Sequence, residues 1–409
     1  MRPSRVRLLA WAAVMSSSSS ARAAAGSKQP ASSEAAARSW QPRPAARISR
    51  QRRSQPGSAP FGYRTSSQVP VDPPARPARA TVSEPPTHPA DRPTAVIATG
   101  GTIAMATEPG SGLQRPILTG AELAARISGL DVPLAHSQPY AIASEDATFE
   151  HWLTLAREVE QLAPGHAGVV VMHGTDTMEE AAFFLSECLP RHPVAFCGAM
   201  QPPGTVGYDG GRNLLDAISV ARSPLAPELG TVVVMNHEVL PAWDVIKRDS
   251  VALDSFSTRH GTRIGTVHDR QLRLLSRPLQ FNWLNAIPAA APSADAVAYV
   301  RLTGSPGRRQ FRAAVGGADG VVIDALGAGS VPAAVKADVI AVSALVPVVL
   351  TTRTGSGPVQ AEDSYPHAWD DLLAAGVTLE KRLDGPRARI RLTLSLALDR
   401  AYAPFEPYI

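Results

Sequence analysis

The stretch AGVVVMHGTDTMEEAAFFLSECLPRHPVAFCGAM, residues 167–200, decides the fold of this chain. It holds an apolar run that ends before His173, a segment with apolar side chains three and four residues apart, and a second apolar run that ends at Met200. This order predicts a buried strand, a helix and a second, parallel strand. Upstream, TAVIATGG from Thr94 predicts an earlier buried strand that runs into a glycine turn.

The same alternation continues toward the C-terminus. GGRNLLDAISVARS predicts a helix, GTVVVMNHEVL a single strand, and AVAYVRL, ADGVVIDALG and PVVLTTRT further strands, with a helix from Val331. RARIRLTLSLAL alternates like a strand and also fits a closing helix, which we favour. We therefore expect an α/β protein with a parallel sheet covered by helices on both faces. Its expected parts are a disordered tail over 1–93, a larger α/β domain over 94–285, a linker over 286–296 and a smaller α/β domain over 297–409.

The basic character of the chain belongs to its N-terminal tail. Residues 1–92 hold fifteen Lys and Arg against four Asp and Glu, whereas the remainder holds 25 against 32. The calculated pI of about 9.3 therefore gives no reason to expect a nucleic-acid partner. The Ser-, Ala-, Arg- and Pro-rich tail cannot bury enough apolar surface to offset its chain entropy, which predicts disorder.

Targeting and redox signals are weak. MRPSRVR followed by LLAWAAVM is similar to the start of a signal peptide, but the apolar stretch is short. We therefore expect a cytoplasmic protein, with a periplasmic one as the alternative if that segment directs export. No apolar run approaches 18 residues, so no membrane-spanning helix is expected. Cys188 and Cys197 are too few for a disulfide scaffold or a cysteine metal site and are expected to be buried thiols.

Three predicted strands end in unusual polar residues, and in parallel sheets ligands bind at such ends. The first is ATGGTIAM, in which Gly100 and Gly101 let the backbone approach a ligand closely. Thr102 places a hydroxyl beside these backbone N–H groups, an arrangement that suits a nucleophile next to an oxyanion site. The alternative is a plain strand-to-loop turn with a buried threonine.

The second strand end is HGTDTMEE, where the hydroxyl of Thr175 and the carboxylate of Asp176 come directly before a helix. Thr177 and Glu180 have the spacing of a helix capping box, which accounts for those two residues but not for the Thr175–Asp176 pair. We interpret His173 as a buried structural residue rather than as a base.

The third strand end leads into AWDVIKRDSV, which contains Lys247. The ordinary interpretation is a solvated loop. The alternative turns Lys247 inward against Asp176, where it could exchange a proton with a threonine. A further segment, IASEDATFEHW, places Ser144 and Glu145 before a helix, either as a cap or as a clamp for the charged groups of a small zwitterion.

The glycine-rich segment GAMQPPGTVGYDGGRNLLDA, residues 198–217, is a loop that leads into a helix. It lacks the lysine of the nucleotide-binding P-loop, and G-x-G-x-x-G does not occur. We therefore reject nucleotide binding.

Together and in this order, ATGGTIA, SED, HGTDTMEE, GAMQP with DGGRNLLDA, and MN with DVIK resemble the motifs of bacterial-type L-asparaginases and glutaminase-asparaginases. The resemblance runs from about Thr94 to Ala397 and leaves the tail outside it. It implies a doubly wound, flavodoxin-like N-terminal domain and a smaller C-terminal α/β domain. It also implies hydrolysis of L-asparagine without metal or cofactor, by a homotetramer built as a dimer of dimers.

The resemblance also implies roles for individual residues. Thr102 matches the nucleophile, and Thr175, Asp176 and Lys247 match the cluster in which the lysine relays a proton. The residues implied in substrate binding are Ser144 for the α-carboxylate, Asp176 for the α-ammonium, Thr175, Glu145 at a position where members carry Gln or Glu, and Ala199, whose backbone matches part of the oxyanion-binding surface.

Two features depart from the family pattern. Residues 105–119 contain no tyrosine, although members carry one there that activates the nucleophile. Tyr365 from a partner chain is a candidate replacement. GAGSVP replaces an asparagine-bearing stretch of the smaller domain, which makes Ser330 a candidate for that substrate contact.

Three other functions stay open at this point. They are an amidase for another small amide, the glutaminase of a tRNA amidotransferase, and a catalytically silent amino-acid-binding protein. The second is disfavoured because its members carry an additional N-terminal domain that a disordered tail does not supply. The third is disfavoured because a binding protein needs no hydroxyl nucleophile.

Overall fold

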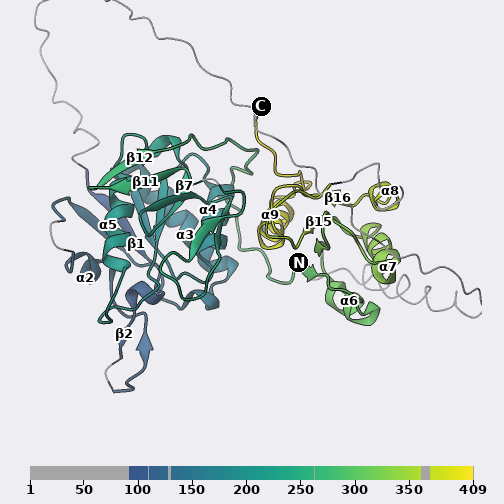
Figure 1. Cartoon of the computed structure of the whole chain (residues 1–409), viewed down its shortest axis with the longest axis horizontal. Coiled ribbons are helices and arrows are strands. Elements are labelled where there is room, and N and C mark those ends of the chain that lie inside the picture. Colours follow the sequence, from purple (N-terminus) through teal and green to yellow (C-terminus); the bar gives the residue numbers. More distant parts are fainter. Residues whose placement is uncertain (1–91, 109, 128–129, 262, 361–368, 409) are drawn as a thin grey trace, which may run out of the picture. The chain divides into compact units, whose positions relative to one another are not determined.

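The computed structural model describes residues 92–408 apart from 109, 128–129, 262 and 361–368. Two sheets of four or more strands form in this described part, and the chain between them, 275–296, holds no helix and no strand beyond an isolated bridge (Figure 1). Residues 1–91 of the tail expected to be disordered lie outside the described residues, and the domain boundaries stay predictions.

The larger sheet contains the strands expected around residues 167–200. Five of its strands are parallel and lie in the order β4-β1-β5-β6-β7, which is the 2-1-3-4-5 order of flavodoxin-like sheets. The predicted fold class is therefore confirmed. From edge to edge the strands are β12 (Gln271–Leu274), β11 (Gly265–His268), β8 (Glu238–Pro241), β7 (Thr231–Met235), β6 (Val194–Cys197), β5 (Val169–Met172), β1 (Thr94–Ala98) and β4 (Leu134–Ser137).

The single strand predicted from GTVVVMNHEVL is wrong. Asn236 and His237 have φ values of 48° and 66° and reverse the chain, so that β7 and β8 pair as an antiparallel hairpin. Two consecutive residues with positive φ make the tight turn that matches the twist of a hairpin, and asparagine tolerates this conformation. Strands β11 and β12 then extend the sheet antiparallel to their neighbours.

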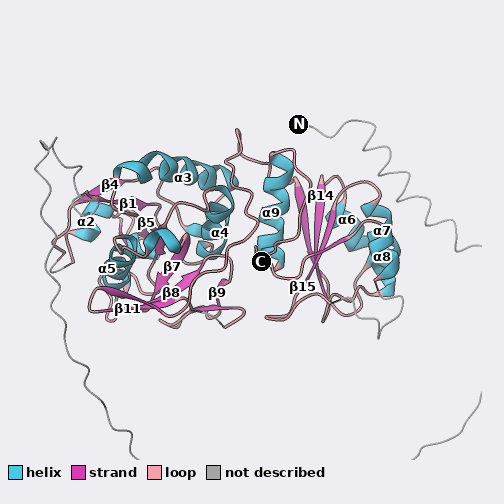
Figure 2. Cartoon of the chain, turned by 90° about the horizontal axis from the view of Figure 1, so that it is seen from above, coloured by secondary structure: helices cyan, strands magenta, loops and turns pink. Residues whose placement is uncertain are grey.

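Helices cover both faces of this sheet, as predicted. Successive strand residues enter different cores, since Val96 packs in the core of α2 and α5, and Ile97 in that of α3 and α4. Figure 2 shows α3 and α5 on opposite sides of the strands. The helices and short 3-10 turns are α2 (Gly120–Ala124), α3 (Phe149–Leu162), η5 (Ala163–Gly165), α4 (Met178–Cys188), α5 (Gly210–Ala221) and η6 (Ala226–Glu228). Cys188 and Cys197 are buried free thiols, as predicted.

The smaller sheet is parallel and also has helices on both faces. Helix α9 lies along one face, and α6, α7 and α8 lie along the other (Figure 2). The predicted closing helix is α9, which Asp384 caps through the N–H of Arg387. Helix α9 also packs against α4 in one shared core. The elements are β13 (Val297–Arg301), α6 (Arg308–Val315), β14 (Gly320–Ala325), α7 (Ala333–Ser343), β15 (Val348–Thr352), α8 (Asp370–Ala374), β16 (Thr378–Leu379) and α9 (Gly385–Ala397). No helix in the described part of the chain is long and apolar enough to cross a membrane.

Candidate active site

The loop after β1 touches two other loops through backbone atoms alone. Gly100 and Gly101 have φ values of 105° and 78°, which L side chains rarely adopt. A Cβ atom on Gly100 would lie 2.2 Å from the carbonyl oxygen of Ile142, and one on Gly101 would lie 2.2 Å from the Cα atom of Gly174. These contacts require glycine and bring Thr102, the first residue of the 3-10 turn η3 (Thr102–Ala104), to the end of β5.

Ser144 completes this meeting of loops. A Cβ atom on Gly174 would lie 2.6 Å from both the Cβ and the Oγ atoms of Ser144. Ser144 is buried in the 3-10 turn η4 (Ser144–Asp146), and its Oγ atom accepts a hydrogen bond from the Asp176 N–H at 3.2 Å. It does not cap α3, because Thr148 caps that helix. The hydroxyl of Ser144 is therefore left to donate to a ligand.

The capping box predicted for α4 does not form. Thr177 is the N-cap residue, but its side chain makes no capping hydrogen bond. Its Oγ1 atom instead donates to the carbonyl oxygen of Ser144 at 2.8 Å. Glu180 therefore has no reciprocal partner, and the hydroxyl expected to serve the helix fastens two loops of the site together.

Lys247 points inward, which is the second of the two interpretations that the sequence left open. It lies on strand β9 (Val245–Lys247), which pairs antiparallel with β10 (Phe256–Thr258). Its Nζ atom donates to Thr175 Oγ1 at 2.8 Å and lies 2.6 Å from Asp176 Oδ1. The Lys247 side chain is 16% exposed and that of Asp176 is 59% exposed, so one carboxylate oxygen of Asp176 stays accessible beside a lysine that is mostly covered.

The loop after β6 brings Ala199 to the same edge of the sheet. A Cβ atom on Gly198 would lie 3.2 Å from Thr175 Cγ2, so this loop lies against the second strand end. Ala199 is fully buried, and its N–H has no hydrogen-bond partner among the described residues. A buried N–H group without a partner is uncommon and is suited to hold an oxyanion.

Asp209 and Asn213 hold this loop, and neither was predicted from the sequence as a residue of the site. Asp209 Oδ1 accepts from the N–H groups of both Met200 and Gln201 at 3.0 Å, and Asn213 donates to the carbonyl oxygen of Gly198 at 3.0 Å. The Asn213 side chain also bonds Asp209 at 2.9 Å. Their spacing of four residues at the start of a helix was the available signal, because it places both side chains on one face.

Glu145 and the chain after Thr102 border a hollow next to these loops. Strands β2 (Ala106–Thr107) and β3 (Gln114–Arg115) form a hairpin. A cavity of about 440 Å³ lies between this hairpin and the segment that contains Glu145. The hydroxyl of Thr102 makes no hydrogen bond within the described part of the chain.

The two remaining candidates are Ser330 and Tyr365. Ser330 is an exposed residue whose backbone bridges to Leu326 after β14. Tyr365 lies outside the described residues, and its role stays a prediction. If Tyr365→Phe leaves turnover unchanged, that role is wrong.

His173 has the properties of a structural residue, as interpreted from the sequence. It is buried, and its Nδ1 atom lies 2.8 Å from the carbonyl oxygen of Gly174. Because a carbonyl only accepts, Nδ1 carries the proton of the neutral ring. Burial lowers the pKa of His173 to about 4, against a smaller opposing effect of the Gly174 carbonyl, so the ring is neutral and held in place at neutral pH.

Comparison with known proteins agrees with this architecture. Residues 94–280 match the family model of the asparaginase N-terminal domain, and residues 296–405 match that of the glutaminase/asparaginase C-terminal domain. A probable L-asparaginase from Deinococcus radiodurans is 36% identical over 314 residues, covering 74% of this chain and 92% of the relative. An L-asparaginase from Bacillus licheniformis is 32% identical over 310 residues, covering 74% and 95%. The crystal structure of a probable cytoplasmic L-asparaginase from Campylobacter jejuni has a TM-score of 0.63 and 27% identity, covering 75% and 95%.

A doubly wound sheet, a smaller parallel sheet and a polar cluster at the strand ends define a two-part α/β amidohydrolase. The class follows from the two matched family models and from relatives that this chain matches over nearly their whole length. The chain belongs to the asparaginase family, and the motif resemblance seen in the sequence is thereby confirmed.

Proposed function

We propose that this protein is an L-asparaginase, which hydrolyses the side-chain amide of L-asparagine to L-aspartate and ammonia with minor activity on L-glutamine. The observation that carries the proposal is the inward contact of Lys247 with Thr175 and Asp176 beside the glycine loop of Thr102. It supplies a nucleophile, a proton path and a site for an amino acid at one edge of the sheet.

The charged groups of the substrate account for the binding residues. Lys247 holds one oxygen of Asp176, and the exposed remainder of that carboxylate binds the α-ammonium group. Ser144 Oγ already accepts from the Asp176 N–H, so its own proton is available for the α-carboxylate. Glu145 and the backbone of Ala199 complete the site, the latter at the amide oxygen. Charge-assisted hydrogen bonds of this kind fix a zwitterion in one orientation.

The reaction runs through a covalent intermediate. The Thr102 oxygen attacks the amide carbon, and the hydroxyl proton of Thr102 passes to the amide nitrogen. The carbon–nitrogen bond breaks, ammonia departs, and the substrate remains bound to Thr102 as an acyl ester. Lys247 and Thr175, whose polar atoms are 2.8 Å apart, form the proton path. Water then attacks the ester carbon, aspartate departs, and the proton returns to Thr102. The Ala199 N–H stabilises the oxyanion of both steps.

The assembly follows the family pattern in this proposal, and the compartment follows from the short apolar stretch of the N-terminal segment. We expect a homotetramer built as a dimer of dimers, in which a partner chain completes each site. We also expect a cytoplasmic location, with a periplasmic one as the alternative if that segment directs export. Light scattering coupled to gel filtration tests the assembly. A monomer with full activity would contradict the expectation of a shared site.

The deciding measurement is ammonia release from L-asparagine and L-glutamine at equal concentrations. Thr102→Ala should lower asparagine turnover by roughly 10³-fold or more, because the nucleophile is lost. Thr266→Ala, on strand β11 away from the cluster, is the matched control and should keep normal turnover. Release of ammonia from asparagine that persists in Thr102→Ala would refute the assigned nucleophile. Tight binding of aspartate without ammonia release would favour a silent binding protein, and release from another small amide alone would favour an amidase.

A further inference from the structure

Lys247 is held through its backbone as well as through its amino group. The N–H of Lys247 donates to Glu179 Oε2 at 2.6 Å, and β9 pairs with β10 over only three residues. So short a strand pair has little stability of its own. The direction of the Lys247 side chain therefore depends on other groups that bond the backbone of β9.

Arg387, from the first turn of α9, provides that hold. Its side chain is fully buried, and its Nη2 atom donates to the carbonyl oxygen of Val245, two residues before Lys247. Its Nη1 atom donates to Asp384 Oδ2 at 2.6 Å, while Asp384 Oδ1 accepts from the Arg387 N–H at 3.0 Å. The guanidinium group is thus fixed at both ends and spans from helix α9 to strand β9.

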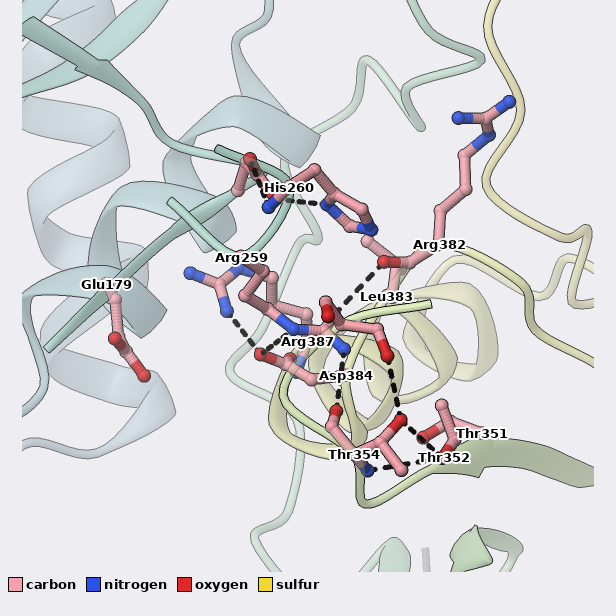
Figure 3. A network of polar contacts seen from close by, with 12 residues as sticks. Glu179, Arg259, His260, Thr351, Thr352, Thr354, Arg382, Leu383, Asp384 and Arg387 are labelled. Carbon is pink, nitrogen blue, oxygen red and sulfur yellow. Dashed lines mark hydrogen bonds and ion pairs between the residues drawn. The ribbon is translucent and has the colours of Figure 1, made fainter. Parts of the chain in front are cut away.

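The same arginine affects the carboxylate that holds the Lys247 backbone. Burial raises the pKa of Glu179, and Arg387 is the largest influence that opposes this rise. A deprotonated Glu179 is the stronger acceptor for the Lys247 N–H. Figure 3 shows Arg259 and Arg387 beside Asp384, and Arg259 bonds the carbonyl oxygen of Arg382 at 3.1 Å.

We propose that Arg387 is a positioning residue for Lys247, which it fixes by holding strand β9. The inference rests on the proposed function, in which Lys247 relays a proton. It assigns to helix α9 of the smaller α/β part a share in setting the geometry of the site on the larger one. Arg387 acts through other residues, since its hydrogen bonds within the described part of the chain go to Asp384 and Val245.

The chain offers a matched control on the same helix. Arg391 lies one turn further along α9, is equally buried, and pairs with Glu187 at 2.6 Å without contact to β9. Arg387→Lys and Arg391→Lys both keep a positive charge and both lose the planar fork of the guanidinium group. A general loss of stability would therefore affect both variants alike, whereas a positioning role belongs to Arg387 alone.

Two readouts are needed, of which one does not depend on turnover. The first is kcat and KM for L-asparagine, and the second is the rate at which acetic anhydride acetylates Lys247, followed by peptide mass spectrometry with Lys336 as the internal standard. Arg387→Lys should lower kcat roughly tenfold with KM within about twofold, because small misplacements of a reacting group slow chemistry steeply. Lys247 should become acetylated roughly three times faster or more as the strand opens. Arg391→Lys should leave both values within about twofold.

Equal effects of the two variants, or an unchanged acetylation rate in Arg387→Lys, would overturn the inference. If the wild-type protein releases no ammonia, the proposed function fails, and the acetylation rates still decide whether Arg387 positions Lys247. Should Arg387→Lys fail to fold, Asp384→Asn releases the Nη1 end of Arg387 instead, with Glu187→Gln as its control. The acetylation rate of Lys247 must then rise in Asp384→Asn and stay unchanged in Glu187→Gln.

Discussion

The acid sensitivity of the protein should depend on His173. The pKa of His173 is about 4 in the folded protein, against 6.5 for a free imidazole. Below pH 6.5 the unfolded chain takes up a proton that the folded chain refuses, so folding loses stability as the pH falls toward 4. A difference of about 2.5 pH units at 1.36 kcal/mol per unit corresponds to about 3 kcal/mol. Above pH 6.5 His173 is neutral in both the folded and the unfolded chain, so its titration no longer lowers the stability.

The test compares His173→Asn with the wild-type protein. Asparagine can keep the hydrogen bond to the Gly174 carbonyl and does not titrate. The free energy of unfolding in urea, measured at pH 7 and at pH 4.5 at one protein concentration, should fall by about 2–3 kcal/mol more in the wild type than in the variant. Equal losses in the two proteins would refute the argument. Turnover at pH 8 gives a second check, because loss of a general base would lower kcat by roughly 10²-fold or more.

Three further substitutions test other parts of the site and core. Gly101→Ala would place Cβ 2.2 Å from Gly174 Cα at a positive φ, so we expect kcat to fall by roughly 10²-fold; steady-state kinetics near wild type would contradict this. Arg391→Leu leaves the buried carboxylate of Glu187 unpaired and should lower the free energy of unfolding in urea by about 3–5 kcal/mol. The double variant with Glu187→Leu should regain most of this loss. A fully stable single variant would show that the pair contributes little. Asp209→Ala removes the acceptor of two backbone N–H groups and should raise KM for L-asparagine several-fold; an unchanged KM and kcat would mean that the loop holds itself.

Much of the fold followed from local pattern. The strands β1, β5 and β6 are almost wholly apolar, a pattern typical of strands that are covered on both faces of the sheet. The hairpin after β7 did not follow, because its turn depends on the positive φ of two residues between two short apolar runs. Asn236 was the signal for that turn.

The geometry of the site was predictable from the sequence only in part. Thr102, Thr175 and Asp176 stand at strand ends, so their shared edge could be expected from parallel pairing. Lys247 lies 71 residues beyond Asp176, and nothing in a spacing of that length implies contact. The contact exists because Glu179 on α4 accepts from the Lys247 N–H and because Arg387 on α9, 140 residues further along the chain, bonds the carbonyl oxygen of Val245 on β9.

Two different kinds of constraint therefore fix the two halves of the site. Thr102 and Ser144 are placed by glycine backbones in van der Waals contact, where no side chain can be added. Lys247 is placed by buried hydrogen bonds and charges that come from α4 and α9. The backbone contacts do not depend on pH. The hydrogen bonds that place Lys247 depend on the charge of Glu179, and burial raises the pKa of Glu179. Acidification should therefore loosen the lysine before it disturbs the threonine loop, so that acetylation of Lys247, corrected for the reactivity of Lys336, rises at pH values where the fold is still intact.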